Sequence, residues 1–187
     1  IRVSDIGKHK QVFKLKHRRK MTGAIFGDIE GSVYEFRNTD NYNFEYYDKN
    51  SHITDDSVCT LAVADSILHG TPAEEALTAF CKRLPGESYG GRFAMWLSSK
   101  NKQPYNSCGN GAAMRVSPVG WAATSESECK EMSEYVTAVT HNHPEGLKGA
   151  EAVSMAIFRL KGAKEEGEKN AIIDEIMREY YPKVTDE

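Results

Sequence analysis

Three consecutive side chains with oxygen ligands are the clearest candidates for chemistry. Thr54, Asp55 and Asp56 directly precede an apolar, helically periodic stretch that begins near Val58. Thr and Asp are preferred at helix starts, where they cap free backbone N–H groups. The same residues offer hard oxygen ligands of the kind that Mg²⁺, Mn²⁺ or Ca²⁺ binds, although three oxygens do not complete an octahedron. Capping and metal binding are both open interpretations here.

A second candidate is the glycine-rich segment 108–120, which contains Gly109, Asn110 and Gly111. Small residues let backbone N–H groups approach a ligand, and beside a helix start such groups form an anion site suited to a diphosphate. The segment lacks the lysine of a P-loop and follows no predicted strand, so Walker and Rossmann sites are not indicated. A glycine loop alone therefore predicts an anion site and nothing more specific.

Segment 21–36 carries a glycine at every fourth position, at residues 23, 27 and 31. In a helix this spacing makes a stripe without side chains, where another helix or a ligand can come close. Each glycine costs such a helix about 1 kcal/mol, so we expect close packing to offset it. The segment also holds three acids that need partners or a cation in an apolar helix, namely Asp28, Glu30 and Glu35.

The fourth candidate segment is 140–146, with His141 and His143 before Pro144. Pro favours the first helical position, so Asn142 or His143 is expected just before a helix. A His-x-His pair can bind a transition metal, but no third soft or imidazole ligand is placed with it. Capping and hydrogen bonding remain possible, as does substrate contact with His as a donor.

The elements around these segments are predicted to be helices. A capping box at 71–74 should begin a helix that ends at Pro85, and a second box at 125–128 should begin one that reaches Thr140. Further apolar stripes at helical spacing cover 58–68, 150–160 and 172–180. Hairpin signals are missing, so the expected fold is all-α, with long polar loops at 37–53 and 98–120.

Charge divides the 187 residues into two parts. Residues 1–20 hold eight basic residues and one acid, and because the net charge is -3 overall, residues 21–187 carry -10. We interpret 1–20 as a basic N-terminal extension and 21–187 as one domain, too acidic for general nucleic-acid binding. With no membrane span, no secretory signal and four widely spaced, reduced cysteines, we expect a cytoplasmic protein.

In combination and order, these segments resemble the ADP-ribosylglycohydrolase family, which includes the dinitrogenase-reductase-activating glycohydrolase. The resemblance runs from Met21 to about Leu160 and rests on segments 23–35, 54–57, 89–92, 109–115 and 140–146. It implies an orthogonal multi-helix bundle. It also implies a metal-dependent hydrolase that cleaves the glycosidic bond between ADP-ribose and a modified side chain or another ADP-ribose.

The resemblance also implies roles for single residues. Thr54, Asp55 and Asp56 match a metal motif for Mg²⁺, with Mn²⁺ as the alternative, in a site that holds two ions in complete relatives. Glu35 matches an acid that assists proton transfer, and so joins Asp55 and Asp56 as a catalytic candidate. The segments that surround ADP-ribose in the family contain Gly109, Asn110, Gly111, Met114, Arg115 and His141. Tyr89 and Arg92 are weaker matches.

One family feature has no counterpart in this sequence. Relatives end with a second acidic motif, similar to Gly-Asp-x-Asp-Thr, that completes the metal site. We therefore expect a C-terminally truncated domain with impaired hydrolysis. The alternatives are a natural remnant, a non-catalytic ADP-ribose-binding protein or a structural, crystallin-like relative. A nucleic-acid binder with a basic arm would rest on residues 8–20 alone, and the oligomeric state is not predicted.

Overall fold

The computed structural model describes residues 22–184 except 42, 45 and 47, and all regular elements in this part of the chain are helices. The predicted all-α fold is therefore confirmed, whereas the basic segment 1–20 lies outside the described residues. No helix in this part is long and apolar enough to cross a membrane. The elements are α3 (Thr22–Gly31), the 3-10 helix η2 (Ser32–Tyr34), α4 (Asp55–His69), α5 (Ala73–Arg83), α6 (Gly91–Ser98), α7 (Ser117–Ala122), α8 (Glu126–Thr137), α9 (Pro144–Leu160) and α10 (Glu166–Tyr180).

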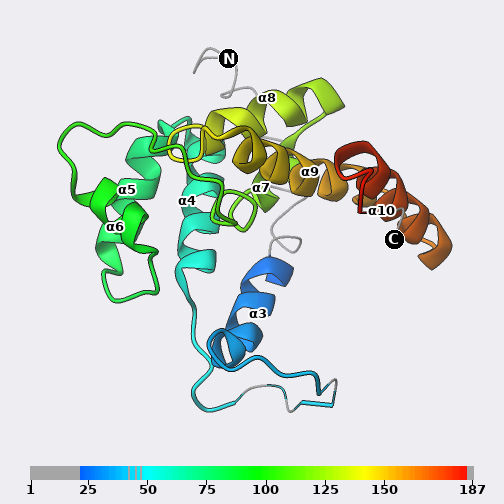
Figure 1. Ribbon diagram of the computed structural model, residues 1–187, viewed down its shortest axis with the longest axis horizontal. Helices are drawn as coiled ribbons and strands as arrows, with labels where there is room; N and C mark the ends of the chain where they lie inside the picture. The colour runs from blue at the N-terminus through cyan, green and yellow to red at the C-terminus, as the bar shows by residue number, and fades with distance from the viewer. Residues whose placement is uncertain (1–21, 42, 45, 47, 185–187) are drawn as a thin grey trace.

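Helix α4 contributes side chains to both hydrophobic cores. Its first half contributes Val58, Cys59 and Ala62 to a core with α5 and α6, and its second half contributes Val63 and Ile67 to a core with α7, α8 and α9. In Figure 1, α4 stands near the middle, with α5 and α6 on one side and α8 and α9 above. Helix α10 covers the far end of α9, and α3 lies below the body. The start of α4 thus faces the space between α3 and α6.

Two predicted helix starts are confirmed by their caps. The Ser125 hydroxyl accepts a hydrogen bond from the Glu128 amide, and His143 Nδ1 accepts one from the Glu145 amide, with Pro144 as the first residue of α9. The capping box at 71–74 is wrong. Helix α5 begins at Ala73 without a side-chain cap, because the Thr71 hydroxyl donates to the Asp65 carboxylate instead.

The predicted loops are correct in part. No helix lies in the described residues of 37–53, but the expected loop 98–120 ends in α7, which begins at Ser117. Helix α6 was not predicted. It has eight residues and follows Gly90 without a side-chain cap, so the sequence carries neither a start signal nor a long periodic stripe.

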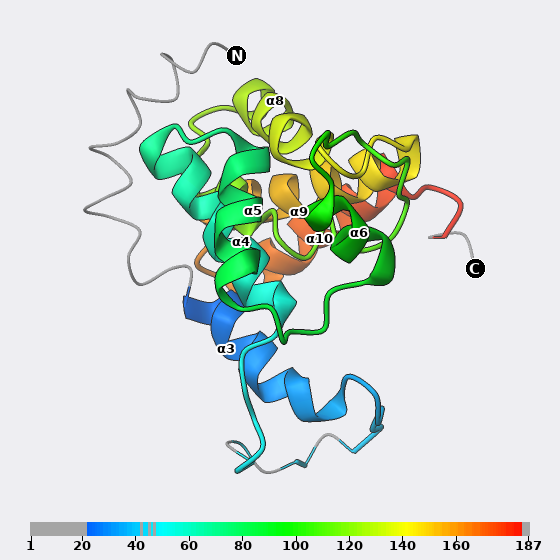
Figure 2. The ribbon, with the colours of Figure 1, turned by 90° about the vertical axis from the view of Figure 1, so that its left-hand side faces the viewer.

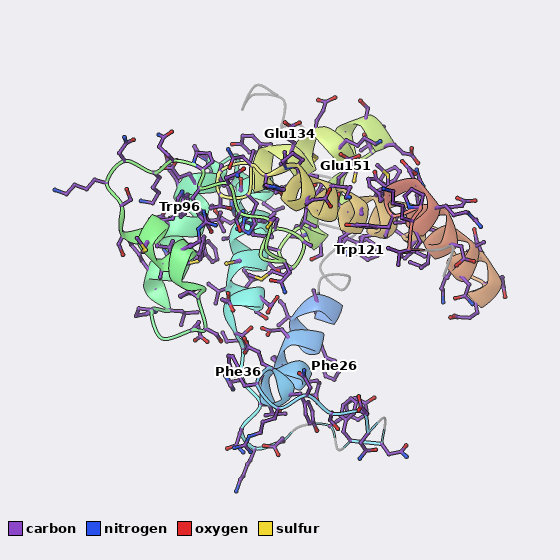
Figure 3. All side chains as sticks on the ribbon, in the orientation of Figure 1. Phe26, Phe36, Trp96, Trp121, Glu134 and Glu151 are labelled. Atoms are coloured by element: carbon purple, nitrogen blue, oxygen red, sulfur yellow. The ribbon has the colours of Figure 1, made fainter. Side chains whose placement is uncertain are left out.

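The glycine stripe of α3 is open in the described structure, contrary to the expected close packing. A Cβ atom placed on Gly23, Gly27 or Gly31 would meet no atom within 4 Å. Of the helices described, α3 packs mainly on η2 and α4. In Figure 2 it extends away from the other helices, and Figure 3 shows Phe26 and Phe36 in this lower part, where both side chains are exposed.

The close crossing of α7 and α9 at Gly120 yields the first prediction. A Cβ atom on Gly120 would lie 2.5 Å from the Ser154 carbonyl oxygen and 2.7 Å from Ile157 Cβ. Gly120→Ala should therefore lower the free energy of unfolding by about 1–3 kcal/mol in urea titrations, because α7 and α9 must move apart. Gly167→Ala is the control, since it meets open space in α10 and should be neutral or stabilising. Equal effects of the two variants would contradict the prediction.

Candidate functional site

One cleft brings the predicted site segments together. It has a volume of about 410 Å³ and lies between the start of α4, the segment that leads into α6 and the glycine loop. The predicted site residues that line it are Glu35, Asp55, Asp56, Gly109, Asn110, Gly111, Met114, Arg115 and His141. Thr54 does not line the cleft and is only 2% exposed. The structure thus gathers residues up to 106 positions apart in sequence, while their roles stay predictions.

Asp28 fixes the start of α4 from the neighbouring helix. Its carboxylate accepts hydrogen bonds from the Thr54 amide at 2.9 Å, the Thr54 hydroxyl at 2.5 Å and the Ser57 amide at 3.1 Å. The first N–H groups of a helix have no partner within the helix, and a carboxylate there also interacts favourably with the helix dipole. The partner expected for this acid of α3 is therefore the helix start of α4.

Thr54 is the N-cap of α4. Its hydroxyl accepts a hydrogen bond from the Asp56 amide at 3.2 Å and donates to Asp28. These contacts use its one proton and one of its two lone pairs. Of the two interpretations open from the sequence, capping is thus observed for Thr54. A metal ligand at this point would have to come chiefly from the carboxylates that follow.

Asp55 and Asp56 lie at the cleft within a group of like charges. Burial raises the pKa of Asp55 to about 6, and repulsion from Asp56, Glu35 and Asp28 adds to the shift. Burial and the charge of Asp28 also raise the pKa of Asp56. A divalent cation would relieve this repulsion, and carboxylate oxygens suit Mg²⁺ or Mn²⁺. Within the described residues, however, no three His, Cys, Asp or Glu side chains form a group that could hold a metal ion.

The segment 105–107, which leads into the glycine loop 108–116, is fixed against the turn before α9. The Tyr105 amide donates to the Thr140 carbonyl, and the Asn106 amide donates to the Asn142 side-chain oxygen at 2.7 Å. Asn106 has a φ of 52°, the left-handed conformation that Asn tolerates better than most residues. Gly146 completes the contact, since a Cβ there would lie 2.6 Å from the Ser107 carbonyl oxygen.

Arg115 is a buried cation at the cleft. It is 1% exposed, and its guanidinium donates to the Val136 carbonyl at 3.2 Å and the Thr140 hydroxyl at 2.7 Å. Burial lowers its pKa, its Nε has no hydrogen-bond partner, and no ion pair joins it to a carboxylate of the described chain. A buried charge without a counter-ion is costly, so an anion in the cleft would compensate it.

His141 is held neutral and oriented by the same network. The pKa of His141 is lowered to about 4, first by burial and then by the charges of Arg115 and Arg92. The Thr140 hydroxyl accepts from Arg115 and shares a hydrogen bond of 2.8 Å with His141 Nδ1; when the hydroxyl is the donor of this bond, the ring proton lies on Nε2. Nε2 lies 3.3 Å from a Cβ placed on Gly111, so it faces the glycine loop. A neutral imidazole with this proton is a hydrogen-bond donor near physiological pH.

The cleft also contains residues that the sequence did not predict. Ser88 donates to the Glu35 carboxylate at 3.3 Å, and Tyr105 lies beneath the Arg92 guanidinium, 5.0 Å from ring centre to Cζ. Arg92 had only a weak motif match, and the weaker match Tyr89 lies outside the cleft lining. Ser88 and Tyr105 carry no signal in the sequence, because their places depend on how α6 and the loop after it pack.

Comparison with known proteins identifies the family of the chain. The family model for ADP-ribosylglycohydrolase matches residues 13–187. The chain belongs to the ADP-ribosylglycohydrolase family. Among curated proteins, no sequence matches significantly. The family assignment supports an ADP-ribosylglycohydrolase-type hydrolase in general.

The raised pKa of Asp55 yields a prediction on stability. Asp55 binds its proton more tightly when folded than when unfolded, so stability falls as the pH rises from about 4 to about 6. Asp55→Asn should therefore raise the free energy of unfolding at about pH 7.5 by at most about 1 kcal/mol, after allowance for solvent screening. At about pH 4 the gain should nearly vanish in urea titrations. Asp174→Asn, at an exposed acid of α10, is the control. The same gain at both pH values would refute this account.

Proposed function

We propose that the cleft binds ADP-ribose and that the chain's carboxylates support metal-dependent hydrolysis of its glycosidic bond to a modified side chain or related ADP-ribosyl conjugate. One observation carries the proposal. The acidic start of α4 and the glycine loop, which lie more than 50 residues apart, border the same cleft, with a buried cation beside the loop. Family membership supports the reaction class.

The chemical character of each part fits a portion of this substrate. The glycines of the loop allow its N–H groups to approach the diphosphate, whose charge would offset that of buried Arg115. Neutral His141 donates its Nε2 proton to a ligand oxygen. Because Arg115 is almost fully buried, we assign it an electrostatic role and a role in orienting His141 through Thr140, more than direct contact with the ligand.

Asp55 and Asp56 would hold the divalent cation, Mg²⁺ or Mn²⁺, in this proposal. A bound cation supplies a Lewis acid that polarises water and orients the ribose hydroxyls. Glu35 lies along the same cleft and accepts a hydrogen bond from Ser88, and in this proposal it would take a proton from the attacking water. Water would add at the anomeric carbon, the bond from that carbon to the side chain would break, and the proton taken up by Glu35 would pass to the leaving side chain.

The second candidate function is a protein that binds ADP-ribose without cleaving it. It is favoured by the small number of metal ligands, because Asp55 and Asp56 alone must bind the cation in the described chain while the Thr54 hydroxyl serves as a cap. Poor positioning of water by about 1 Å can cost 100-fold in rate. We therefore propose that the 187-residue chain by itself is severely impaired as a catalyst.

Titration calorimetry with Mn²⁺ tests the metal site. We expect weak binding, with a Kd on the order of 10⁻⁴–10⁻³ M, because two carboxylates and water form an incomplete shell. The double variant Asp55→Asn with Asp56→Asn should lose it, whereas Asp174→Asn should not. With Mn²⁺ and an ADP-ribosylated peptide, turnover should stay near the no-enzyme background. Equal Mn²⁺ binding by the double variant would refute the metal assignment, and full turnover would refute the impairment.

Thermal denaturation with ADP-ribose tests the pocket. ADP-ribose should raise the Tm, and His141→Phe should weaken its affinity about tenfold, the loss of one hydrogen bond of about 1–1.5 kcal/mol. His69→Phe is the matched control, since His69 lies at the exposed far end of α4. Without a shift for the unmodified chain, the pocket assignment fails. An unchanged affinity in His141→Phe would instead remove only the proposed donor.

A further inference from the structure

Two cysteine thiols meet under the cleft and take no part in the proposed function. Cys59 Sγ and Cys81 Sγ lie 3.8 Å apart, although the residues are 22 positions apart in sequence. Cys59 comes from the first turns of α4 and Cys81 from the end of α5, and both are buried. Cys59 also forms part of the cleft lining. The pair is therefore close to the cleft while belonging to the core between the two helices.

The surroundings of the pair disfavour a metal site and favour oxidation chemistry. A structural zinc ion needs four ligands, and the described residues offer no His, Asp, Glu or third Cys to complete a group with these thiols. A disulfide needs an S–S distance of about 2.05 Å, so the two sulphurs must approach by less than about 2 Å. Since they already share a hydrogen bond, no other side chain has to leave the space between them.

The electrostatic environment supplies a reactive sulphur. The hydrogen bond with Cys59 lowers the pKa of Cys81 although burial opposes the shift, and the positive charge of Arg115 lowers it further. The same hydrogen bond raises the pKa of Cys59. Thiolates rather than thiols react with oxidants. Cys59 is buried but borders the cleft, so a peroxide, which is little larger than water, would approach the pair from there.

We propose that Cys59 and Cys81 are a site of reversible disulfide formation by peroxide, which restrains the acidic end of the cleft. One thiol of the pair loses its proton, and the thiolate attacks one peroxide oxygen; the O–O bond breaks, and the leaving hydroxide takes up that proton, so that a sulfenic acid and water form. The second thiol attacks the sulfenic sulphur, the S–S bond forms, and a second water leaves. Two thiols thus lose two electrons while hydrogen peroxide is reduced to two water molecules.

The position of Cys59 connects this bond to the carboxylates. Cys59 lies one helical turn after Asp55, so both residues are on one face of α4. Joining Cys59 to α5 would fix that turn against the neighbouring helix and restrict its local opening. The formation of the disulfide depends on the thiol pair alone, so it stands or falls independently of ADP-ribose binding.

Mass spectrometry of the folded chain tests the bond. The 187-residue protein is treated with hydrogen peroxide, its free thiols are blocked with N-ethylmaleimide in guanidinium, and it is digested without reduction. We expect peptides linked through Cys59 and Cys81, and their release by dithiothreitol. Cys129 is the internal control for a buried thiol without a second cysteine beside it. It should not be oxidised by the peroxide and should therefore react with N-ethylmaleimide in guanidinium. Cys108 is exposed and reports that the peroxide was active.

Oxidation of Cys108 with both Cys59 and Cys81 still free would overturn the proposal, as would a link that forms only after the helical circular-dichroism signal is lost. Cys81→Ser and, if it folds poorly, Cys81→Ala should abolish the linked peptides. Hydrogen exchange of residues 55–62 should slow at least twofold in the oxidised chain, while that of α10 stays unchanged. Linked peptides with unchanged exchange would refute the restraint on the cleft.

Discussion

The carboxylate of Asp28 is the contact on which the rest of the site depends. It binds the amides of Thr54 and Ser57 and the Thr54 hydroxyl, so it joins α3 to α4 and sets where α4 begins. Because Asp55 and Asp56 are the first two residues of α4, this contact determines their position at the cleft. It also adds a negative charge beside them, which raises the pKa of both carboxyls further. The contact that fixes the helix start thus also adds to the negative charge around Asp55 and Asp56.

Local signals predicted the helices well where capping and periodicity agreed. Ser125 and His143 cap the helices expected after them, since their hydrogen bonds span only a few residues. The capping box predicted at Thr71 is wrong because its hydroxyl donates to Asp65 on the preceding helix. Helix α6 was not predicted because its eight residues after Gly90 are too few to show a clear helical periodicity. Interactions between residues a few positions apart can be predicted from a sequence. A competing hydrogen bond to a residue of another helix cannot.

The residues of the candidate site could mostly be predicted from residue types and motif order. The hydrogen bonds and contacts between them could not. The motifs placed Asp55, Gly109 and His141 among the site residues, and the structure gathers them at one cleft. The bond from Asp28 to Thr54 and the approach of Cys59 to Cys81 join residues 26 and 22 positions apart. No spacing rule predicts such pairs, because they depend on how α3 and α5 pack on α4. The burial of the Arg115 guanidinium could not be predicted either, because it also depends on how the helices pack.

The contact between the glycine loop and the turn before α9 has a consequence for exchanging segments between family members. The loop keeps its course because Asn142 binds the Asn106 amide and because Gly146 leaves room for the Ser107 carbonyl. These partners belong to a different segment, about 35 to 40 residues along the chain. A loop transplanted from a relative would therefore bring its own ligand-binding residues but not the partner residues in the turn before α9 that hold it in place. In such an exchange, segments 105–111 and 140–146 should be kept or replaced together, because each holds the other in place.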